Sequence, residues 1–262
     1  MEALLQKVCA VARAAGARML EAGALCVREK EGHANFVTDL DEAVQAQVIE
    51  ALTPLVPGAQ FVAEEKRNEA VSTGCAWVID PIDGTQNFIS GLRHSAVSIA
   101  LLEDGSPALG AVYDPYADEL FAARAGGGAY LNGRRMAVSS RELSRAVVFF
   151  GTAPYNLELT DQSFAAAQAI FRVCCDVRRS GSAALDLCAV AAGRCEGYFE
   201  LRLSPWDYAA GSLIVQEAGG RVGALSPDAW GFERPIGVLA APAQTYDALE
   251  ALIQGAREGG AL

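Results

Sequence analysis

Residues 77–88 read WVIDPIDGTQNF, and this stretch decides how the rest of the chain is interpreted. Its apolar start predicts a buried strand that ends at Asp80. Asp83 follows three residues later, and Gly84 and Thr85 precede a short predicted helix. This spacing predicts that two carboxylates lie at the end of one strand and face the same cleft.

The chemistry of this pair indicates a bound cation. Two neighbouring carboxylates disfavour each other's ionisation, and a divalent cation removes that cost. Oxygen ligands without a nearby histidine or cysteine indicate a hard ion, Mg²⁺ first and Mn²⁺ second. Gly84 lets the backbone approach an anion, and free N–H groups at the following helix start would point at a phosphate. The alternative is an Asp-Pro turn with a side-chain cap and no catalytic role.

Further acidic residues also lie at the ends of predicted strands and helices. Glu64 and Glu65 follow the predicted strand 61–63, as Asp80 follows its own strand. Asp207 opens the predicted helix 207–218, where it acts as an N-cap, as a metal ligand or as both.

The N-terminal half is predicted to combine helices with an antiparallel sheet. Helical spacing of apolar residues predicts helices over 2–23 and 39–53, and Asp39 is the predicted cap of the second. Short apolar runs separated by turn residues predict a meander of antiparallel strands. The runs of this meander are 95–102, 108–114 and 119–123, and the shorter runs 61–63 and 77–79 before it predict buried strands. Three glycines and an Asn-Gly pair then predict a hairpin over 123–135.

The C-terminal half alternates between the two kinds of element. Its predicted strands are 146–151, 173–177, 196–201 and 236–241, and its predicted helices are 161–171, 182–192, 207–218 and 242–256. We therefore expect a layered α/β or α+β core. Its two halves, residues 1–145 and 146–262, are expected to share an interface and form one compact unit.

The composition limits the class of protein. The 262 residues carry a net charge of −11, and 52% of them are hydrophobic. The hydrophobic residues are numerous enough to form a buried core. The negative charge disfavours nucleic-acid binding, because a negative surface repels phosphates. No apolar run reaches the length of a membrane span, and the N-terminus predicts an amphipathic helix instead of a signal peptide. The seven cysteines show no CxxC spacing, so we predict reduced thiols packed in a core and a cytoplasmic location.

The scarcity of certain residue types disfavours several common catalytic sites. The chain has two histidines, His33 and His94, which disfavours zinc sites and a Ser-His-Asp triad. We expect both histidines to be structural or solvated. No lysine follows a glycine, so the glycine run 126–128 does not form a nucleotide P-loop.

Three segments, AEE (63–65), WVIDPIDGTQNF (77–88) and PWDYAAGSLIVQEAGG (205–220), resemble the signature regions of the inositol monophosphatase family. Further segments fit in order: NFVTDLD (35–41), GAVYDP (110–115), GGGAYLNG (126–133) and SGSAALDLC (180–188). The match covers residues 20–241. The resemblance implies a Mg²⁺-dependent, lithium-sensitive phosphomonoesterase that forms a homodimer. It also implies a layered α-β-α-β-α sandwich of the sugar phosphatase type, with a mixed, largely antiparallel sheet in the N-terminal half and a second sheet in the C-terminal half.

The resemblance assigns roles to particular residues. Two to three Mg²⁺ ions would be held by Glu64, Asp80, the carbonyl of Ile82, Asp83 and Asp207. Asp41 and Thr85 would orient and deprotonate the attacking water, with Glu64 as a further catalytic residue. The substrate would meet Ile82, Asp83, Gly84, Thr85 and Asp207 on its phosphate side, and Gly181, Ser182, Ala183 and Glu200 on its alcohol side. Lys30 would give weak electrostatic support, and Glu65 would support the ligands.

Several alternatives stay open at this point. The first expected substrate is myo-inositol monophosphate, and a fructose-1,6-bisphosphatase, a histidinol-phosphatase or a nucleotide 3′-phosphatase would use the same scaffold. Arg202 and the pair Ser204-Pro205 depart from some inositol-specific members where substrate selection would occur. Glu200 is alternatively an exposed acid at a strand end. A regulatory protein on an enzyme fold, for example in a transcription complex, is the third alternative, disfavoured because all the acids are present.

Overall fold

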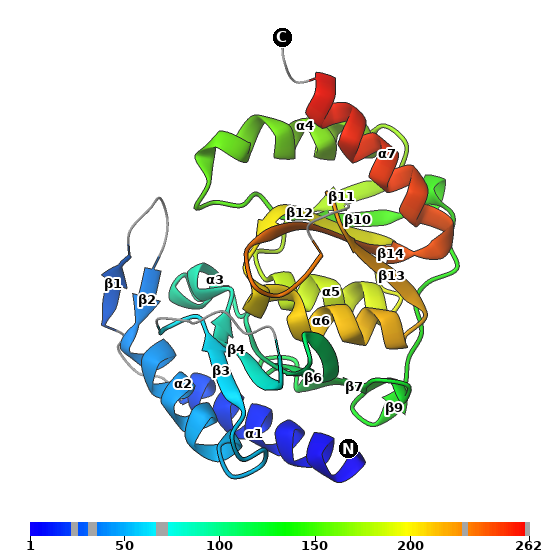
Figure 1. Cartoon of the computed structure of the whole chain (residues 1–262). Helices are drawn as coiled ribbons and strands as arrows, with labels where there is room; N and C mark the ends of the chain where they lie inside the picture. Colours follow the sequence, from blue (N-terminus) through cyan, green and yellow to red (C-terminus); the bar gives the residue numbers. More distant parts are fainter. Residues whose placement is uncertain (22–25, 31–35, 67–72, 227–229, 260–262) are drawn as a thin grey trace.

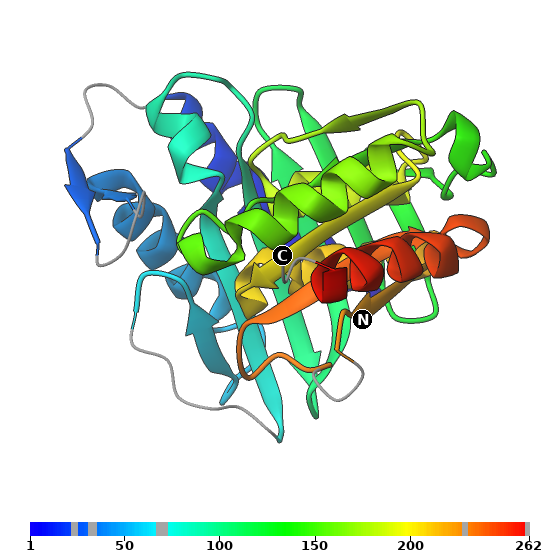
Figure 2. The same cartoon turned by 90° about the horizontal axis from the view of Figure 1, so that it is seen from above.

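The computed structural model describes residues 1–21, 26–30, 36–66, 73–226 and 230–259. It shows five layers (Figure 1; Figure 2 gives the view from above). The outer helices α1 (Glu2–Leu20) and α2 (Asp39–Leu52) cover one face of a seven-stranded sheet. Helices α5 (Ala183–Ala191) and α6 (Pro205–Glu217) separate it from a five-stranded sheet. Helices α4 (Thr160–Phe171) and α7 (Ala243–Gly259) cover the far side, so the predicted α-β-α-β-α sandwich is confirmed.

The first sheet has the order β3-β4-β5-β6-β7-β8-β9. Its strands are β3 (Gln60–Ala63), β4 (Cys75–Asp83), β5 (Ala96–Glu103), β6 (Ser106–Asp114), β7 (Glu119–Arg124), β8 (Gly128–Leu131) and β9 (Arg134–Arg135). β3 pairs parallel with β4, and all other neighbours pair antiparallel, which confirms the predicted meander. The hairpin over 123–135 is also confirmed, with Asn132 and Gly133 at φ 48° and 77° in its second turn.

Strand β4 is buried on both faces because it lies between two helical layers. Ala76 and Val78 pack in the core shared with α5 and α6. Trp77 and Ile79 pack on the opposite side in the core shared with α1 and α2. The alternation of side chains along a strand explains why this segment reads as a continuous apolar run.

The second sheet has the order β11-β10-β12-β14-β13. Its strands are β10 (Val147–Phe150), β11 (Asp176–Arg178), β12 (Gly197–Leu203), β13 (Gly220–Ala224) and β14 (Ile236–Pro242). β10 pairs parallel with β11 and β12, while β14 pairs antiparallel with β12 and β13. β13 was not predicted from the sequence, and neither was the small sheet of β1 (Val27–Glu29) and β2 (Phe36–Thr38).

Helix starts differ from the predictions by at most two residues, and the predicted caps of α2 and α6 are wrong. The cap of α2 is Thr38 and not Asp39, because the Thr38 hydroxyl accepts hydrogen bonds from the N–H groups of Leu40 and Asp41. Helix α6 begins at Pro205, capped by Ser204, so Asp207 is its third residue and not its cap. A proline is well suited to a first helical turn, where its missing N–H is not needed.

Other expectations need correction or fall outside the described residues. All seven cysteines are free, but only Cys188 and Cys195 are buried, while Cys26 and Cys175 are exposed. The predicted helix 2–23 ends at Leu20, and residues 22–23 lie outside the described part of the chain, as do His33 and the first residue of the 35–41 motif. Among the described helices, none is both long and apolar enough to cross a membrane.

Candidate functional site

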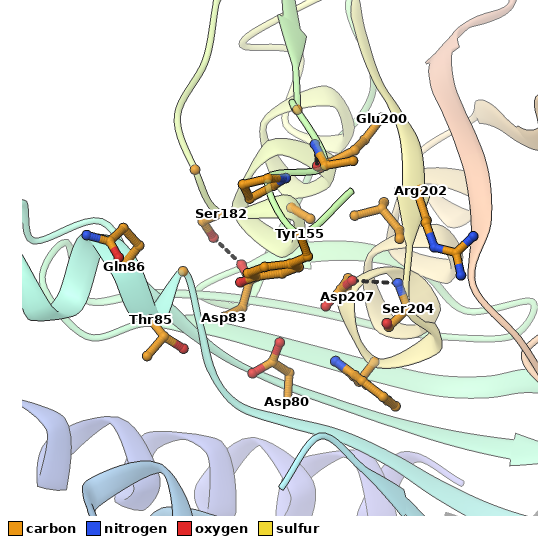
Figure 3. Close-up of a pocket in the computed structure, with 18 of the residues that line it drawn as sticks. Asp80, Asp83, Thr85, Gln86, Tyr155, Ser182, Glu200, Arg202, Ser204 and Asp207 are labelled. Carbon is orange, nitrogen blue, oxygen red and sulfur yellow. Dashed lines mark hydrogen bonds between the residues drawn. The ribbon is translucent and has the colours of Figure 1, made fainter. Parts of the chain in front are cut away.

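The acidic residues from distant parts of the sequence line one cavity of about 320 Å³ (Figure 3). β3 leads to Glu64, β4 supplies Asp80 and Asp83, β12 supplies Glu200, and α6 supplies Asp207. The cavity therefore lies between the two sheets, where the N-terminal end of α5 also reaches it with Ser182 and Ala183.

A β-bulge directs Asp80 and Asp83 to the same side of β4. The strand was predicted to end at Asp80, but it continues to Asp83. Asp80 pairs with Ser98 and Asp83 pairs with Ala96, so the two residues between them on β4 oppose a single residue of β5. Side chains an odd number of residues apart face opposite sides of a regular strand, and the extra residue of a bulge restores the same side. As a result, oxygens of Asp80, Asp83 and Asp207 all lie within 4.8 Å of one another.

Backbone and hydroxyl donors hold each of these three carboxylates. Asp80 Oδ1 accepts a hydrogen bond from the N–H of Ile82 at 3.0 Å, which closes a tight turn. Asp83 Oδ2 accepts from the Ser182 hydroxyl and, at 3.1 Å, from the N–H of Ala184. Asp207 Oδ2 accepts from the N–H of Ser204 at 2.7 Å in the capping box of α6. Each side chain keeps further acceptor capacity for a cation.

The three carboxyl groups are costly to ionise together. Burial raises the pKa of Asp80 well above its usual range, and the charges of Glu64, Asp83 and Asp207 raise it further. Burial also raises the pKa of Asp83 to about 7. The pKa of Asp207 is raised by removal from water and then by the charges of Asp83 and Glu64. An oxygen-only donor set with this excess of negative charge fits a hard divalent cation.

Glu64 lines the same cavity but lies outside the group of three close carboxylates. Its carboxylate is 3.3 Å from Nζ of Lys30, which also forms an ion pair with Glu65. The backbone N–H of Glu65 donates to Oε1 of Gln45 at 2.9 Å. Burial raises the pKa of Glu64, and the charge of Lys30 acts in the opposite direction. The Lys30 ammonium therefore offsets part of the cost of ionising two adjacent carboxylates.

Thr85 connects the acidic cluster to Asp41. Its hydroxyl oxygen lies 3.0 Å from the carbonyl oxygen of Ile82 and 3.3 Å from Oδ1 of Asp41. Asp41 is completely buried, and its other oxygen accepts hydrogen bonds from the N–H and the hydroxyl of Thr38. Burial raises the pKa of Asp41. The two residues predicted to act as a pair on water are therefore in contact, and Thr85 faces the cavity.

Gly84 occupies a position that needs glycine. It precedes the short helix α3 (Thr85–Ile89) with φ 84°, in the left-handed region. A Cβ there would lie 3.1 Å from the carbonyl oxygens of Gly181 and His94. This close approach brings the turn after β4 against residues 181–182 at the start of α5.

Glu200 is buried, so the alternative of an exposed strand-end acid is wrong. Its Oε1 accepts a hydrogen bond from the N–H of Ala153 at 2.7 Å, and its Oε2 accepts from the Tyr198 hydroxyl at 2.7 Å. A Cβ on Gly151 would lie 1.9 Å from Oε2, so only glycine leaves room for this carboxylate. Burial raises the pKa of Glu200.

Several residues that line the cavity were not predicted from the sequence, among them Tyr155, Arg179 and Asp186. Asp186 is buried, and its Oδ1 has no hydrogen-bond partner among the described residues. Burial raises the pKa of Tyr155, and the charges of Glu64 and Asp207 raise it further. Nothing in the local sequence marks these positions, apart from the place of Asp186 in the segment 180–188.

The chain matches the inositol monophosphatase family over residues 1–260. A relative named Nus factor SuhB, from Pasteurella multocida (strain Pm70), is 44% identical over 190 residues, which is 72% of this chain and 71% of the relative. The Thermotoga maritima IMPase structure is similar with a TM-score of 0.89 and 30% identity, covering 99% of this chain and 100% of that one. An inositol monophosphatase structure from Anabaena (Nostoc) sp. PCC 7120 is similar with a TM-score of 0.84 and 35% identity, covering 97% of this chain and 96% of that one.

Proposed function

The chain belongs to the inositol monophosphatase family, and from this premise we propose that it hydrolyses a small polyol phosphate monoester in a Mg²⁺-dependent reaction. Membership in this family supports the activity of a metal-dependent phosphatase. The observation that carries the proposal is the group of three carboxylates, Asp80, Asp83 and Asp207, whose oxygens lie within 4.8 Å of one another. myo-Inositol monophosphate is the first expected substrate.

We propose that two to three Mg²⁺ ions are held by Glu64, Asp80, the carbonyl oxygen of Ile82, Asp83 and Asp207. When bound, Mg²⁺ neutralises phosphate charge and lowers the pKa of a coordinated water molecule. The five ligands come from three separate segments, and hydrogen bonds already orient the three close carboxylates. Little reorganisation is then required on metal binding.

Asp41 and Thr85 are proposed to remove a proton from the attacking water. The Thr85 hydroxyl lies between the cavity and the buried carboxylate of Asp41, so it can donate to Asp41 while accepting from a water molecule. The N–H groups of Gly84 and Thr85 are proposed to donate to the phosphate oxygens. Direct attack by water needs no covalent phosphoenzyme, and the protein supplies positioning and charge stabilisation.

The alcohol part of the ester is proposed to lie against Gly181, Ser182, Ala183 and Glu200. These residues line the cavity on the side of the second sheet. Each oxygen of Glu200 accepts one hydrogen bond within the protein and can accept another from a substrate hydroxyl. A polyol would supply such hydroxyl groups.

A panel of phosphate esters at equal concentration tests the proposal. It compares inositol 1-phosphate, fructose 1,6-bisphosphate, histidinol phosphate and adenosine 3′,5′-bisphosphate, with Mg²⁺, with added lithium and with chelator. We expect the highest kcat/KM for inositol 1-phosphate, inhibition by lithium and no turnover with chelator. Full activity in chelator would refute the metal-dependent mechanism. A higher kcat/KM for another ester would make that ester the proposed substrate in place of inositol 1-phosphate.

The name of the Pasteurella multocida relative, Nus factor SuhB, supports a second candidate, a role as a Nus factor in transcription. This role would bring the chain close to nucleic acid in spite of its charge of −11. Co-purification with a transcription complex by wild-type protein and by the inactive variant Asp80→Asn distinguishes the two functions. Binding by both, without any ester hydrolysed by the wild type, would favour the second candidate.

Three further properties are proposals that rest on family membership and sequence. We propose a homodimer, which light scattering would test, and a cytoplasmic location, which cell fractionation would test. We also propose that the halves 1–145 and 146–262 form one cooperative unit, so that thermal unfolding shows a single transition.

A further inference from the structure

The segment from Gly151 to Asn156 enters the cavity in a conformation fixed by hydrogen bonds. It leads from β10 to the short 3-10 helix η2 (Leu157–Leu159). The N–H of Gly151 donates to the carbonyl of Phe199 at 2.9 Å, and the N–H of Ala153 donates to Glu200 at 2.7 Å. The N–H of Asn156 then donates to the carbonyl of Ala153 at 2.8 Å. Ala153 has a φ of 44°, which is uncommon for a residue other than glycine.

This conformation directs Tyr155 into the cavity. Tyr155 lines it together with the acidic cluster, although half of the residue, 50%, remains exposed. In Figure 3 its phenol ring lies in front of Asp83 and points toward the side of Ser182. The charge of each of the four acids Glu64, Asp80, Asp83 and Asp207 acts on Tyr155, which agrees with a position over the cluster.

The face of Tyr155 differs chemically from the acidic cluster beside it, and Pro154, Leu203, Trp206 and Pro235 are further apolar residues that line the cavity. The phosphate side of the cavity consists of carboxylates, hydroxyls and backbone amides, which recognise charge and hydroxyl groups. An aromatic face instead offers a broad apolar contact area that loses little conformational entropy on binding. The C–H groups of a sugar or cyclitol ring present a matching flat surface, whereas an open-chain polyol must be ordered first and covers less of the ring.

We propose that Tyr155 is a specificity-determining residue that packs against the carbon ring of the substrate, so that the cavity selects cyclic polyol phosphates over open-chain ones. The proposal rests on the proposed phosphatase function. Glu200 has two roles in this arrangement. It faces the alcohol part of the ester, and through the N–H of Ala153 it positions the segment that carries Tyr155.

The test compares kinetics on myo-inositol 1-phosphate and glycerol 2-phosphate with Mg²⁺ for wild type, Tyr155→Ala and Tyr155→Phe. For Tyr155→Ala we expect KM for the cyclic ester to rise about tenfold, with a much smaller change for the open-chain ester and for kcat. Tyr155→Phe keeps the aromatic face and should retain the wild-type preference. Leu157→Ala is the matched control, because Leu157 is 58% exposed two residues further along and does not line the cavity.

The outcomes separate this inference from the proposed function. Equal effects of Tyr155→Ala on both esters, or no effect on either, would overturn the inference while the phosphatase activity stands. A lost preference in Tyr155→Phe would also overturn it, because the hydroxyl and not the ring face would then select the substrate. If the wild type hydrolyses neither this pair nor the ester panel, the proposed function fails and the inference fails with it.

Discussion

Asp83 and Ser182 are 99 residues apart in the sequence, and the Ser182 hydroxyl donates a hydrogen bond to Oδ2 of Asp83. Ser182 is also the N-cap of α5, where its oxygen accepts from the N–H of Leu185 at 3.3 Å. The same Asp83 oxygen accepts from the N–H of Ala184. A candidate metal ligand at the end of β4 therefore also stabilises the helix layer between the two sheets.

Ser182→Ala should weaken both the fold and the candidate metal site. It removes a helix cap and one of the donors to Asp83, so we expect the free energy of unfolding to fall by about 1–2 kcal/mol. The Mg²⁺ concentration for half-maximal activity should rise, because Asp83 is less well oriented. Urea denaturation and a Mg²⁺ titration of activity measure the two effects.

Ser163→Ala is the control for this variant. Ser163 is a buried serine like Ser182, but it lies inside α4 and its hydroxyl has no partner among the described residues. Its removal should leave stability unchanged or slightly higher, since alanine favours a helix. Equal destabilisation by both variants would contradict the link between Ser182 and Asp83.

Asp80→Asn should abolish most of the turnover while the fold is kept. The amide keeps the shape of the side chain but loses a ligand charge at the centre of the acidic cluster, and we expect a fall in kcat of at least about a hundredfold. The metal-free variant should also unfold at a higher temperature than metal-free wild type, because burial and three neighbouring carboxylates act against ionised Asp80. Asp161→Asn, at an exposed position in α4, should change neither quantity.

The stability of the metal-free protein should fall as the pH rises. Asp80, Asp83 and Asp207 have raised pKa values in the folded state, so their contribution is fully present below about pH 4, the unfolded value of such a group. It is lost as the pH rises through the folded pKa, which is about 7 for Asp83. Thermal melts between pH 4 and 8 in the presence of chelator measure this slope.

Mg²⁺ should reverse this pH dependence. It binds the deprotonated carboxylates, so the increase in Tm on adding Mg²⁺ should be larger at pH 8 than at pH 5. The same melts with Asp80→Asn should show a smaller increase. An increase that is independent of pH and of Asp80 would argue against Mg²⁺ binding at these carboxylates.

Thr85→Val and Thr85→Ser separate chemistry from packing. Valine keeps the branched shape but removes the hydroxyl that contacts Asp41, so kcat should fall by about 10²–10⁴-fold. Serine keeps the hydroxyl and should retain much of the activity. The Mg²⁺ requirement should stay the same in both variants. If the valine and serine variants have the same kcat, Thr85 has no part in proton transfer.

Much of the fold followed from local patterns. The meander of β5, β6 and β7 and the hairpin at Asn132-Gly133 were predicted because turn residues separate apolar runs that each fit one strand. β13 was missed because the segment GRVGA has two glycines and one strong β-former, so its strand state depends on pairing with β14. The end of β4 was misplaced because a bulge, which local sequence does not mark, carries the strand past Pro81.

The sequence by itself determined which side chains are the candidates for the chemistry: a set of carboxylates next to predicted strand and helix ends, with Gly84 and Thr85 directly after one of them, Asp83. This was possible because ligand type and element boundaries are local properties of the chain. Only the tertiary structure decided that Asp80, Asp83 and Asp207 meet within 4.8 Å, that Ser182 bonds to Asp83, and that Tyr155 lines the same cavity. Those relationships depend on how β4, α5, α6 and the segment before η2 pack against one another, and packing across such separations leaves no periodic signal in the sequence.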